Sequence, residues 1–202
     1  MSITRTAVPG RRSPDQAAAK RVPGEEGTWV FIFGDILIFA VIFITYLHYR
    51  GQQVAMFNDS QKNLVGGFGV ANTLLLLSSS LLVVVGMRAI NRRRSDLAPW
   101  MFMGAMACGL AFSTLKIVEY GEKLSAGVTP ATNDFYMYYF ILTGLHFFHL
   151  IVGMVILAAI AWASTRPVNA SKKYALIEGG ACFWHMVDLL WIILFPLLYL
   201  VN

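Results

Sequence analysis

Two histidines stand inside an apolar run, in the stretch FILTGLHFFHL at residues 140–150. His146 and His149 are three residues apart, and this spacing places both side chains on one face of a helix. An imidazole is costly to bury in apolar surroundings unless it has a partner. Three kinds of chemistry fit such a pair: hydrogen bonding between helices, ligation of a metal or haem, and proton transfer.

Further ionisable side chains occupy similar apolar surroundings, namely Asp35, Lys116, Glu119, Glu178, His185 and Asp188. The pairs Lys116–Glu119 and His185–Asp188 repeat the spacing of three residues. Lys116 and Glu119 can neutralise each other, which lowers the cost of burial. His185 and Asp188 can bond each other or reach another helix.

Ionisable residues within a membrane segment mark candidate functional sites. We therefore interpret the carboxylates Asp35, Glu119 and Asp188 as proton-linked or partner-facing groups. A polar network inside the membrane is the interpretation for the remaining residues, Lys116, His146, His149, Glu178 and His185.

The elements that must position these residues are long apolar segments. The chain has 202 residues, 57% of them hydrophobic and 13% charged. Its mean hydropathy is +0.61, and this composition is typical of a membrane protein. Apolar stretches long enough to cross about 30 Å of hydrocarbon run roughly over 28–49, 64–90, 97–120, 135–165 and 174–201. Their length excludes the strands of a barrel, so the sequence predicts an all-α bundle of five transmembrane helices.

The basic residues predict how the bundle is oriented. Most of them precede the first span or follow the second and the fourth: Arg5, Arg11, Arg12, Lys20, Arg21, Arg88, Arg92, Arg93, Arg94, Arg166, Lys172 and Lys173. The other loops hold only Arg50, Lys62 and Lys123. The positive-inside rule then places the N-terminus in the cytoplasm and the C-terminus outside. Residues 1–24 are polar and are expected to form a flexible cytoplasmic tail, followed by one transmembrane domain over 25–202.

Small and aromatic residues predict helix contacts. Gly144, Gly153, Gly179 and Gly180 are expected to let the fourth and fifth spans approach closely. Ser78–Ser80 are expected to bond back to their own helix. Aromatic residues at the span ends suggest interfacial belts: Trp29, Tyr46, Tyr49, Trp100, Tyr136 and Tyr199. Pro196 predicts a kink near the end of the last span.

No catalytic residue and no metal ligand set is predicted. The sequence lacks the repeated Glu-x-x-His of di-iron bundles and the H-E-x-x-H of zinc peptidases. It also lacks a Gly-rich phosphate loop, a nucleophile elbow and a covalent haem motif. Two alternatives stay open: a stand-alone b-type cytochrome using His146, His149 and His185, or a proton-conducting protein using the buried acids and Lys116. The missing inverted repeat weighs against a secondary transporter.

The same residues carry a resemblance to subunit III of the haem–copper oxidases. TGLHFFHLIVG at 143–153 is similar to the family signature TGxHxxHVxxG, and WHMVDLLWIILFPLLY at 184–199 resembles its terminal motif. Glu119-Tyr120 matches the family's EY pair. Trp29, Gly34, Asp35 and Phe39 match its carboxylate-bearing span. The resemblance covers about residues 25–201.

Within this family, the chain resembles the short five-span forms. LKIVEYGEKLSAG resembles the NorE-type accessory protein encoded beside bacterial nitric oxide reductases. Lys116 stands where the respiratory oxidase subunit commonly has glutamine.

The resemblance implies a non-catalytic subunit in the bacterial inner membrane, active in respiratory electron transport or denitrification. Such a subunit supports assembly, stability and proton uptake of a catalytic subunit that holds the haem with copper or iron. It binds no haem or metal itself and can hold phospholipid. Asp35 takes the place of a family carboxylate that is typically a glutamate and reacts with carbodiimide. Glutamate is one methylene longer than aspartate. The histidines are implied to act in packing and hydrogen bonding.

Overall fold

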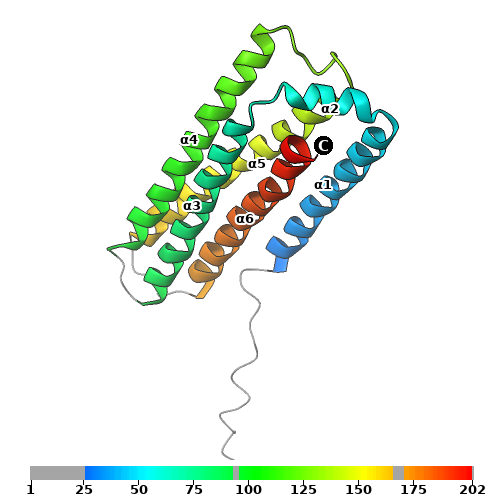
Figure 1. Cartoon of the computed structure of the whole chain (residues 1–202). Helices are drawn as coiled ribbons and strands as arrows, with labels where there is room; N and C mark the ends of the chain where they lie inside the picture. Colours follow the sequence, from blue (N-terminus) through cyan, green and yellow to red (C-terminus); the bar gives the residue numbers. More distant parts are fainter. Residues whose placement is uncertain (1–25, 93–95, 166–170, 202) are drawn as a thin grey trace, which may run out of the picture.

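The computed structural model describes residues 26–92, 96–165 and 171–201. The predicted tail at 1–24, Arg93, Arg94 and Arg166 lie outside these residues, and the side chain of Lys172 is likewise not described. The described chain is entirely helical (Figure 1): α1 Glu26–Gln52, α2 Val54–Lys62, α3 Gly66–Asn91, α4 Ala98–Ser125, α5 Asp134–Ser164, α6 Ser171–Phe195 and the π-helical turn η2 Pro196–Leu200.

Five of these helices are long and apolar enough to cross a membrane. They are α1, α3, α4, α5 and α6 continued by η2, and they lie side by side in one bundle (Figure 1). The predicted fold class is therefore confirmed. Backbone polar groups are satisfied within each helix, which is the requirement for crossing hydrocarbon.

The short helix α2 was not predicted from the sequence. It lies across one end of the bundle, which we call the α2 end (Figure 1). In its sequence VAMFNDSQK the buried residues are Phe57, Ser60 and Gln61. The hydroxyl of Ser60 accepts a hydrogen bond from the Asn133 amide at 2.9 Å, and this bond joins α2 to the start of α5.

The helix boundaries follow local chemistry. Asn133 caps α5, since its side-chain oxygen accepts from the backbone N–H of Tyr136 at 2.9 Å. After α4, Gly127 adopts φ +76°, a conformation open mainly to glycine. The N–H groups of Gly127 and Val128 then bond the carbonyls of Leu124 and Lys123, which closes the helix in a Schellman motif.

α6 changes its character at Pro196. Proline cannot donate a backbone hydrogen bond, and the chain continues as the π-helical turn η2, closed by Val201 N–H on the Pro196 carbonyl at 3.0 Å. The sequence predicted an irregularity at this residue. This irregularity is a π-helical turn, and two side chains of α1 bind it. The hydroxyl of Tyr46 donates to the carbonyl of Leu197, and the guanidinium of Arg50 donates to the carbonyl of Val201.

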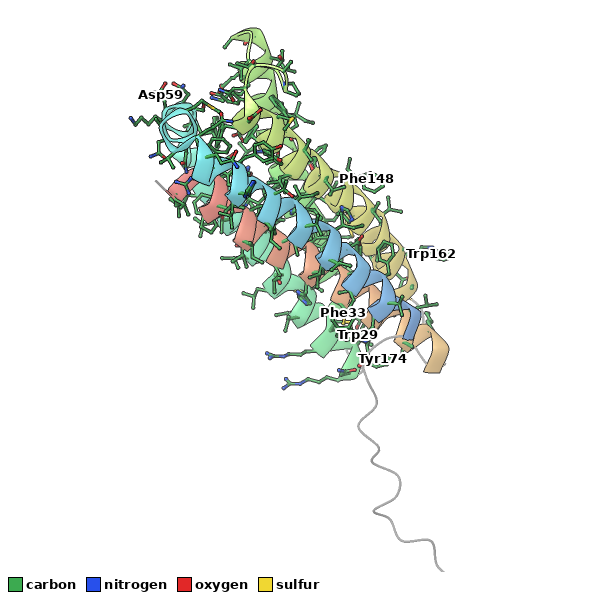
Figure 2. All side chains as sticks on the ribbon, turned by 90° about the vertical axis from the view of Figure 1, so that its right-hand side faces the viewer. Trp29, Phe33, Asp59, Phe148, Trp162 and Tyr174 are labelled. Atoms are coloured by element: carbon green, nitrogen blue, oxygen red, sulfur yellow. The ribbon has the colours of Figure 1, made fainter. Side chains whose placement is uncertain are left out.

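α1 buries only one stripe of its surface. Ile32, Asp35, Phe39 and Tyr46 are buried, at helical spacings of three, four and seven residues. Most of the other large apolar residues of α1 are exposed, among them Val30 at 74% and Leu37 at 67%. Such a surface suits lipid or a partner helix. Figure 2 shows α1 from its outer side, with Trp29 and Phe33 at one end and Asp59 of α2 at the other.

The described basic residues divide between the two ends of the bundle. Arg88 and Arg92 lie where α3 ends, opposite the α2 end, whereas Arg50, Lys62 and Lys123 lie at the α2 end. The predicted orientation of the bundle in the membrane rests on this same division of basic residues. Which end faces the cytoplasm stays a prediction.

Candidate functional site

Lys116 and Glu119 form the best-connected polar cluster in the bundle. Their side chains are 1–2% exposed, and Lys116 Nζ lies 2.9 Å from Glu119 Oε2. The predicted neutralising pair is confirmed. Lys116 also donates to the hydroxyl groups of Tyr139 at 3.1 Å and Tyr199 at 3.0 Å. An ammonium group has three N–H donors, so all of them are used.

The tyrosine hydroxyls complete the cluster on its acidic side. Tyr139 and Tyr199 each donate to Glu119 Oε1, at 2.7 Å and 2.6 Å. The ammonium also lies 4.8 Å from the ring centre of Tyr139 and 5.4 Å from that of Trp191, within range of cation–π attraction. Side chains from α4, α5, α6 and η2 thus enclose a fully paired ion pair. Its geometry suits cross-linking of helices and offers no free group for chemistry.

Asp35 and His149 form a second pair, between α1 and α5. Asp35 Oδ2 lies 3.4 Å from His149 Nε2, and both side chains are largely buried. The separation is within ion-pair range but longer than an ordinary hydrogen bond. His149 Nδ1 lies 2.7 Å from the carbonyl of Leu145. A carbonyl only accepts, so Nδ1 carries a hydrogen.

The His149 tautomer has a consequence for Asp35. A neutral ring with hydrogen on Nδ1 presents a lone pair at Nε2, and a bare carboxylate opposite it would be repelled. A hydrogen bond between the two groups therefore needs a hydrogen on Nε2 or on the carboxyl. Phe39 packs edge-on against the imidazole, at 5.6 Å between ring centres.

His146 occupies the middle of the bundle and is fully buried. Its Nε2 lies 3.1 Å from the carbonyl of Val187 on α6. Its ring packs against Trp191 at 5.1 Å and Phe112 at 5.7 Å. The contact with Val187 makes His146 an interhelical hydrogen-bonder, one of the three alternatives raised by its sequence position.

His185 and Asp188 meet through a serine of another helix. Ser80 Oγ lies 2.7 Å from His185 Nδ1, and its hydroxyl also bonds the Asp188 carboxyl. Ser79 donates to the carbonyl of Ala105 on α4 at 2.9 Å. The expectation that these serines bond back to their own helix was therefore wrong for Ser79 and Ser80, because neighbouring helices offer them partners.

Glu178 lies near the start of α6. It interacts with Tyr174 one turn earlier on α6, at the end opposite α2. Figure 2 shows Tyr174 at this end, near Trp29. The residues predicted as one network therefore fall into separate groups: Lys116 with Glu119, Asp35 with His149, His146 with Val187, His185 with Asp188, and Glu178 with Tyr174.

Two of the four glycines contact the helix that was predicted for them, and two contact another helix. A Cβ on Gly153 would lie 2.8 Å from Trp184, and one on Gly180 would lie 2.6 Å from Ile156, so both allow α5 and α6 to approach as predicted. Gly179 instead accommodates Thr28 of α1, and Gly144 faces Tyr120 of α4. For these two glycines the predicted partner was wrong.

Several members of the site were missed from the sequence. Tyr139 was not singled out, and Tyr46, Tyr136 and Tyr199 were assigned to interfacial belts. Tyr46 and Tyr136 are buried, and Tyr199 belongs to the Lys116 cluster. The sequence held one indication of further polar partners, namely a lysine within an apolar span. The N–H groups of a buried lysine need more acceptors than one carboxylate supplies.

No group of three or more His, Cys, Asp or Glu side chains is placed to hold a metal ion within the described ranges. The fold and site thus define a multi-pass helical membrane protein whose buried ionisable groups have partners within and between helices.

Comparison with known proteins places this arrangement in a family. The family described as "Cytochrome c oxidase subunit III" matches residues 24–202. The subunit 3 of cytochrome c oxidase from Synechocystis is 32% identical over 176 residues, covering 86% of this chain and 74% of the relative. That from Thermostichus vulcanus is 30% identical over 178 residues, covering 87% and 86%. The cytochrome bo(3) ubiquinol oxidase subunit 3 of Buchnera aphidicola is 25% identical over 175 residues, covering 86% and 84%.

The chain belongs to the cytochrome c oxidase subunit III family. Members of this family are non-catalytic membrane subunits of haem–copper oxidases, associate with the catalytic subunit I, and do not themselves bind haem or copper. The five apolar helices and these relatives define a multi-pass bacterial membrane protein.

Proposed function

We propose that this chain is an accessory subunit that supports the assembly, stability and proton uptake of a catalytic haem-containing partner. Family membership over residues 24–202 carries this proposal. The site agrees with it, since the Lys116–Glu119 cluster is saturated with internal partners and the exposed apolar face of α1 suits contact with lipid or another subunit.

The partner in this proposal is the catalytic subunit of a haem–copper oxidase or of a nitric oxide reductase. Lys116 favours the second, NorE-type, branch, because the respiratory subunit is expected to carry glutamine at this position. Glutamine cannot neutralise a buried carboxylate, so the ion pair with Glu119 distinguishes the two versions of this site. The five-span architecture fits either branch.

The proton-linked part of the proposal rests on Asp35. Asp35 pairs with His149 across the contact between α1 and α5, and the two side chains are 8–11% exposed. Asp35 is offered as the carboxylate that acts on the partner. Glu119 and Asp188 are bonded within the bundle, so they are offered as structural acids.

Purification of the tagged full chain from its native membrane in mild detergent tests the proposal. We expect a catalytic oxidase or reductase subunit to co-purify, and its haem spectrum to leave with it when that subunit is stripped away. The identity of the co-purifying subunit names the branch. Haem retained on the stripped chain would instead make it a cytochrome, and purification of a haem-free chain alone from cross-linked membranes would contradict the accessory role.

A further inference from the structure

Four buried polar groups around Trp191 have no protein partner for at least one of their atoms among the described residues. They are the side-chain amide of Asn72, Nδ1 of His146, Nε1 of Trp184 and Oδ1 of Asp188. All four side chains are at most 4% exposed. Unpaired polar groups inside a protein are expensive, and a membrane bundle has no bulk solvent nearby to relieve them.

These groups lie in one region of the bundle. His146 packs on Trp191 and bonds Val187, the residue directly before Asp188. Asp188 precedes Trp191 by three residues, and Trp184 precedes Asp188 by four, so all three share one face of α6.

Asn72 reaches the same region from α3. It precedes Ser79 by two helical turns and shares its face, and Ser79 bonds the Ala105 carbonyl of α4. On α4, which runs antiparallel to α3, Phe112 lies two turns after Ala105 and so at the level of Asn72. Phe112 packs on Trp191 at 4.8 Å between ring centres. Independently, Thr73, the next residue of α3, accepts from Trp191 Nε1 at 3.1 Å.

The donor and acceptor roles of the four groups are mixed. His146 uses Nε2–H on the Val187 carbonyl, so its Nδ1 is an acceptor. Asp188 Oδ1 accepts, Trp184 Nε1–H only donates, and the Asn72 amide does both. The N–H groups would repel a cation, and the carboxyl would repel an anion. A small neutral molecule that donates and accepts satisfies the whole set, and water has these properties.

The region is closed at both ends. Toward α2 lies the Lys116–Glu119 cluster with its tyrosines. Toward the opposite end, Trp184 packs so tightly that a Cβ on Gly153 would lie 2.8 Å from its ring and one on Gly109 would lie 3.1 Å away. A ligand held here is enclosed by α3, α4, α5 and α6, which are neighbours in the bundle (Figure 1).

We propose that Asn72, His146, Trp184 and Asp188 bind a sealed cluster of internal water molecules between α3, α4, α5 and α6. The waters bridge polar groups on α3, α5 and α6 that do not reach one another, and so they bind the helices together. This inference concerns the bundle itself and does not depend on the identity of the partner.

X-ray hydroxyl-radical footprinting of the full chain in nanodiscs tests the proposal, since radiolysis converts bound water into radicals that label the nearest side chains. Phe112 and Phe102 form a matched pair, because both lie on α4 with zero exposure. Phe112 contacts His146 and Trp191, whereas Phe102 packs at Gly86. We expect labelling of Phe112 to exceed that of Phe102 several-fold. Equal labelling of the two, at any level, overturns the proposal.

A variant provides the second measurement. Asn72→Leu keeps a similar volume and removes one water-binding group, and we expect it to lower the Phe112 label. Thr45→Val is the control, because Thr45 bonds only its own helix at the Val41 carbonyl, outside this region. An undiminished Phe112 label in folded Asn72→Leu would count against the amide as a ligand of the cluster. Should Asn72→Leu fail to fold, the comparison of Phe112 with Phe102 in the unmodified chain still decides.

Discussion

Asp35 Oδ2 faces His149 Nε2 across the contact between α1 and α5, at 3.4 Å. His149 Nδ1 donates to the Leu145 carbonyl at 2.7 Å, so Nε2 is the ring nitrogen that faces the carboxyl. The pair is one of the polar links between α1, which is otherwise mostly exposed, and the rest of the bundle, beside the bonds of Tyr46 and Arg50 to the last turn. Its two residues therefore have separable roles in stability and in function.

His149→Leu removes the partner of a buried carboxyl. We expect a loss of about 1–3 kcal/mol in the free energy of unfolding, the usual cost of an unsatisfied buried group. Thermal or denaturant unfolding in detergent measures it. Val155→Leu is the control, since Val155 lies on the same helix and is 65% exposed. Unchanged stability of His149→Leu would show that the pair contributes nothing.

Asp35→Ala tests the proton-linked role. We expect slower turnover of the partner enzyme, or its faster inactivation during turnover, while the assembled complex is recovered in normal amount. Asp59→Ala serves as the control, because Asp59 is an exposed acid on α2 (Figure 2). The prediction is wrong if turnover and inactivation kinetics of Asp35→Ala equal those of the unmodified complex.

Lys116→Met leaves Glu119 buried beside two tyrosine hydroxyls without a cation. Breaking a buried pair in this way costs about 3–5 kcal/mol, so we expect a large fall in thermal stability. The double variant Lys116→Met with Glu119→Gln removes both charges and is expected to recover much of the loss. Lys123→Met, on the same helix but bonded only to the Asn63 carbonyl, should change little. A double variant no more stable than Lys116→Met would contradict the ion-pair account.

Gly153→Ala and Gly144→Ala compare two glycines of one helix. A Cβ on Gly153 would lie 2.8 Å from the Trp184 ring, whereas the nearest atom to a Cβ on Gly144 is at 4.0 Å. We expect Gly153→Ala to destabilise the bundle by about 1–3 kcal/mol through overpacking, and Gly144→Ala to be tolerated. Equal unfolding temperatures for the two variants would show that α5 and α6 are not in close contact at Gly153.

Arg50→Met tests how the π-helical turn is held. Arg50 donates to the Val201 carbonyl at 2.6 Å and to Asn58 at 3.2 Å, so it joins α1, α2 and the end of the described chain. A hydrogen bond to a charged group contributes about 1.5–3 kcal/mol. We expect amide hydrogen exchange over 197–201 to become at least about tenfold faster, as about 1.4 kcal/mol corresponds to tenfold. Arg88→Met, at the opposite end, should leave this exchange unaltered.

Much of the fold could be predicted from the sequence. The five spans follow from apolar runs whose length matches the membrane, and Pro196 marked the place of the π-helical turn. The Lys116–Glu119 pair was predictable because both residues lie on one helix, where a spacing of three residues fixes their distance. α2 escaped prediction because its nine residues carry too few apolar positions to stand out.

The partners between helices could not be predicted in the same way. His185 and Asp188 also share a helix with a spacing of three, yet they meet through Ser80 of α3. Tyr139 and Tyr199 join Lys116 from 23 and 83 residues away. Period and spacing describe one helix at a time, whereas the rotation of each helix about its axis is set by packing against its neighbours.

Apolar runs of membrane-spanning length indicate five crossings of the membrane, and the ionisable residues within these runs can be read from the sequence. Which of those groups meet depends on how the helices pack, and this packing brings Asn72 and Tyr139 into the polar interior. The physical reason is that the membrane imposes helix length through hydrophobicity, which is local, while burial of a charge is relieved by whichever side chain the packing brings within about 3 Å.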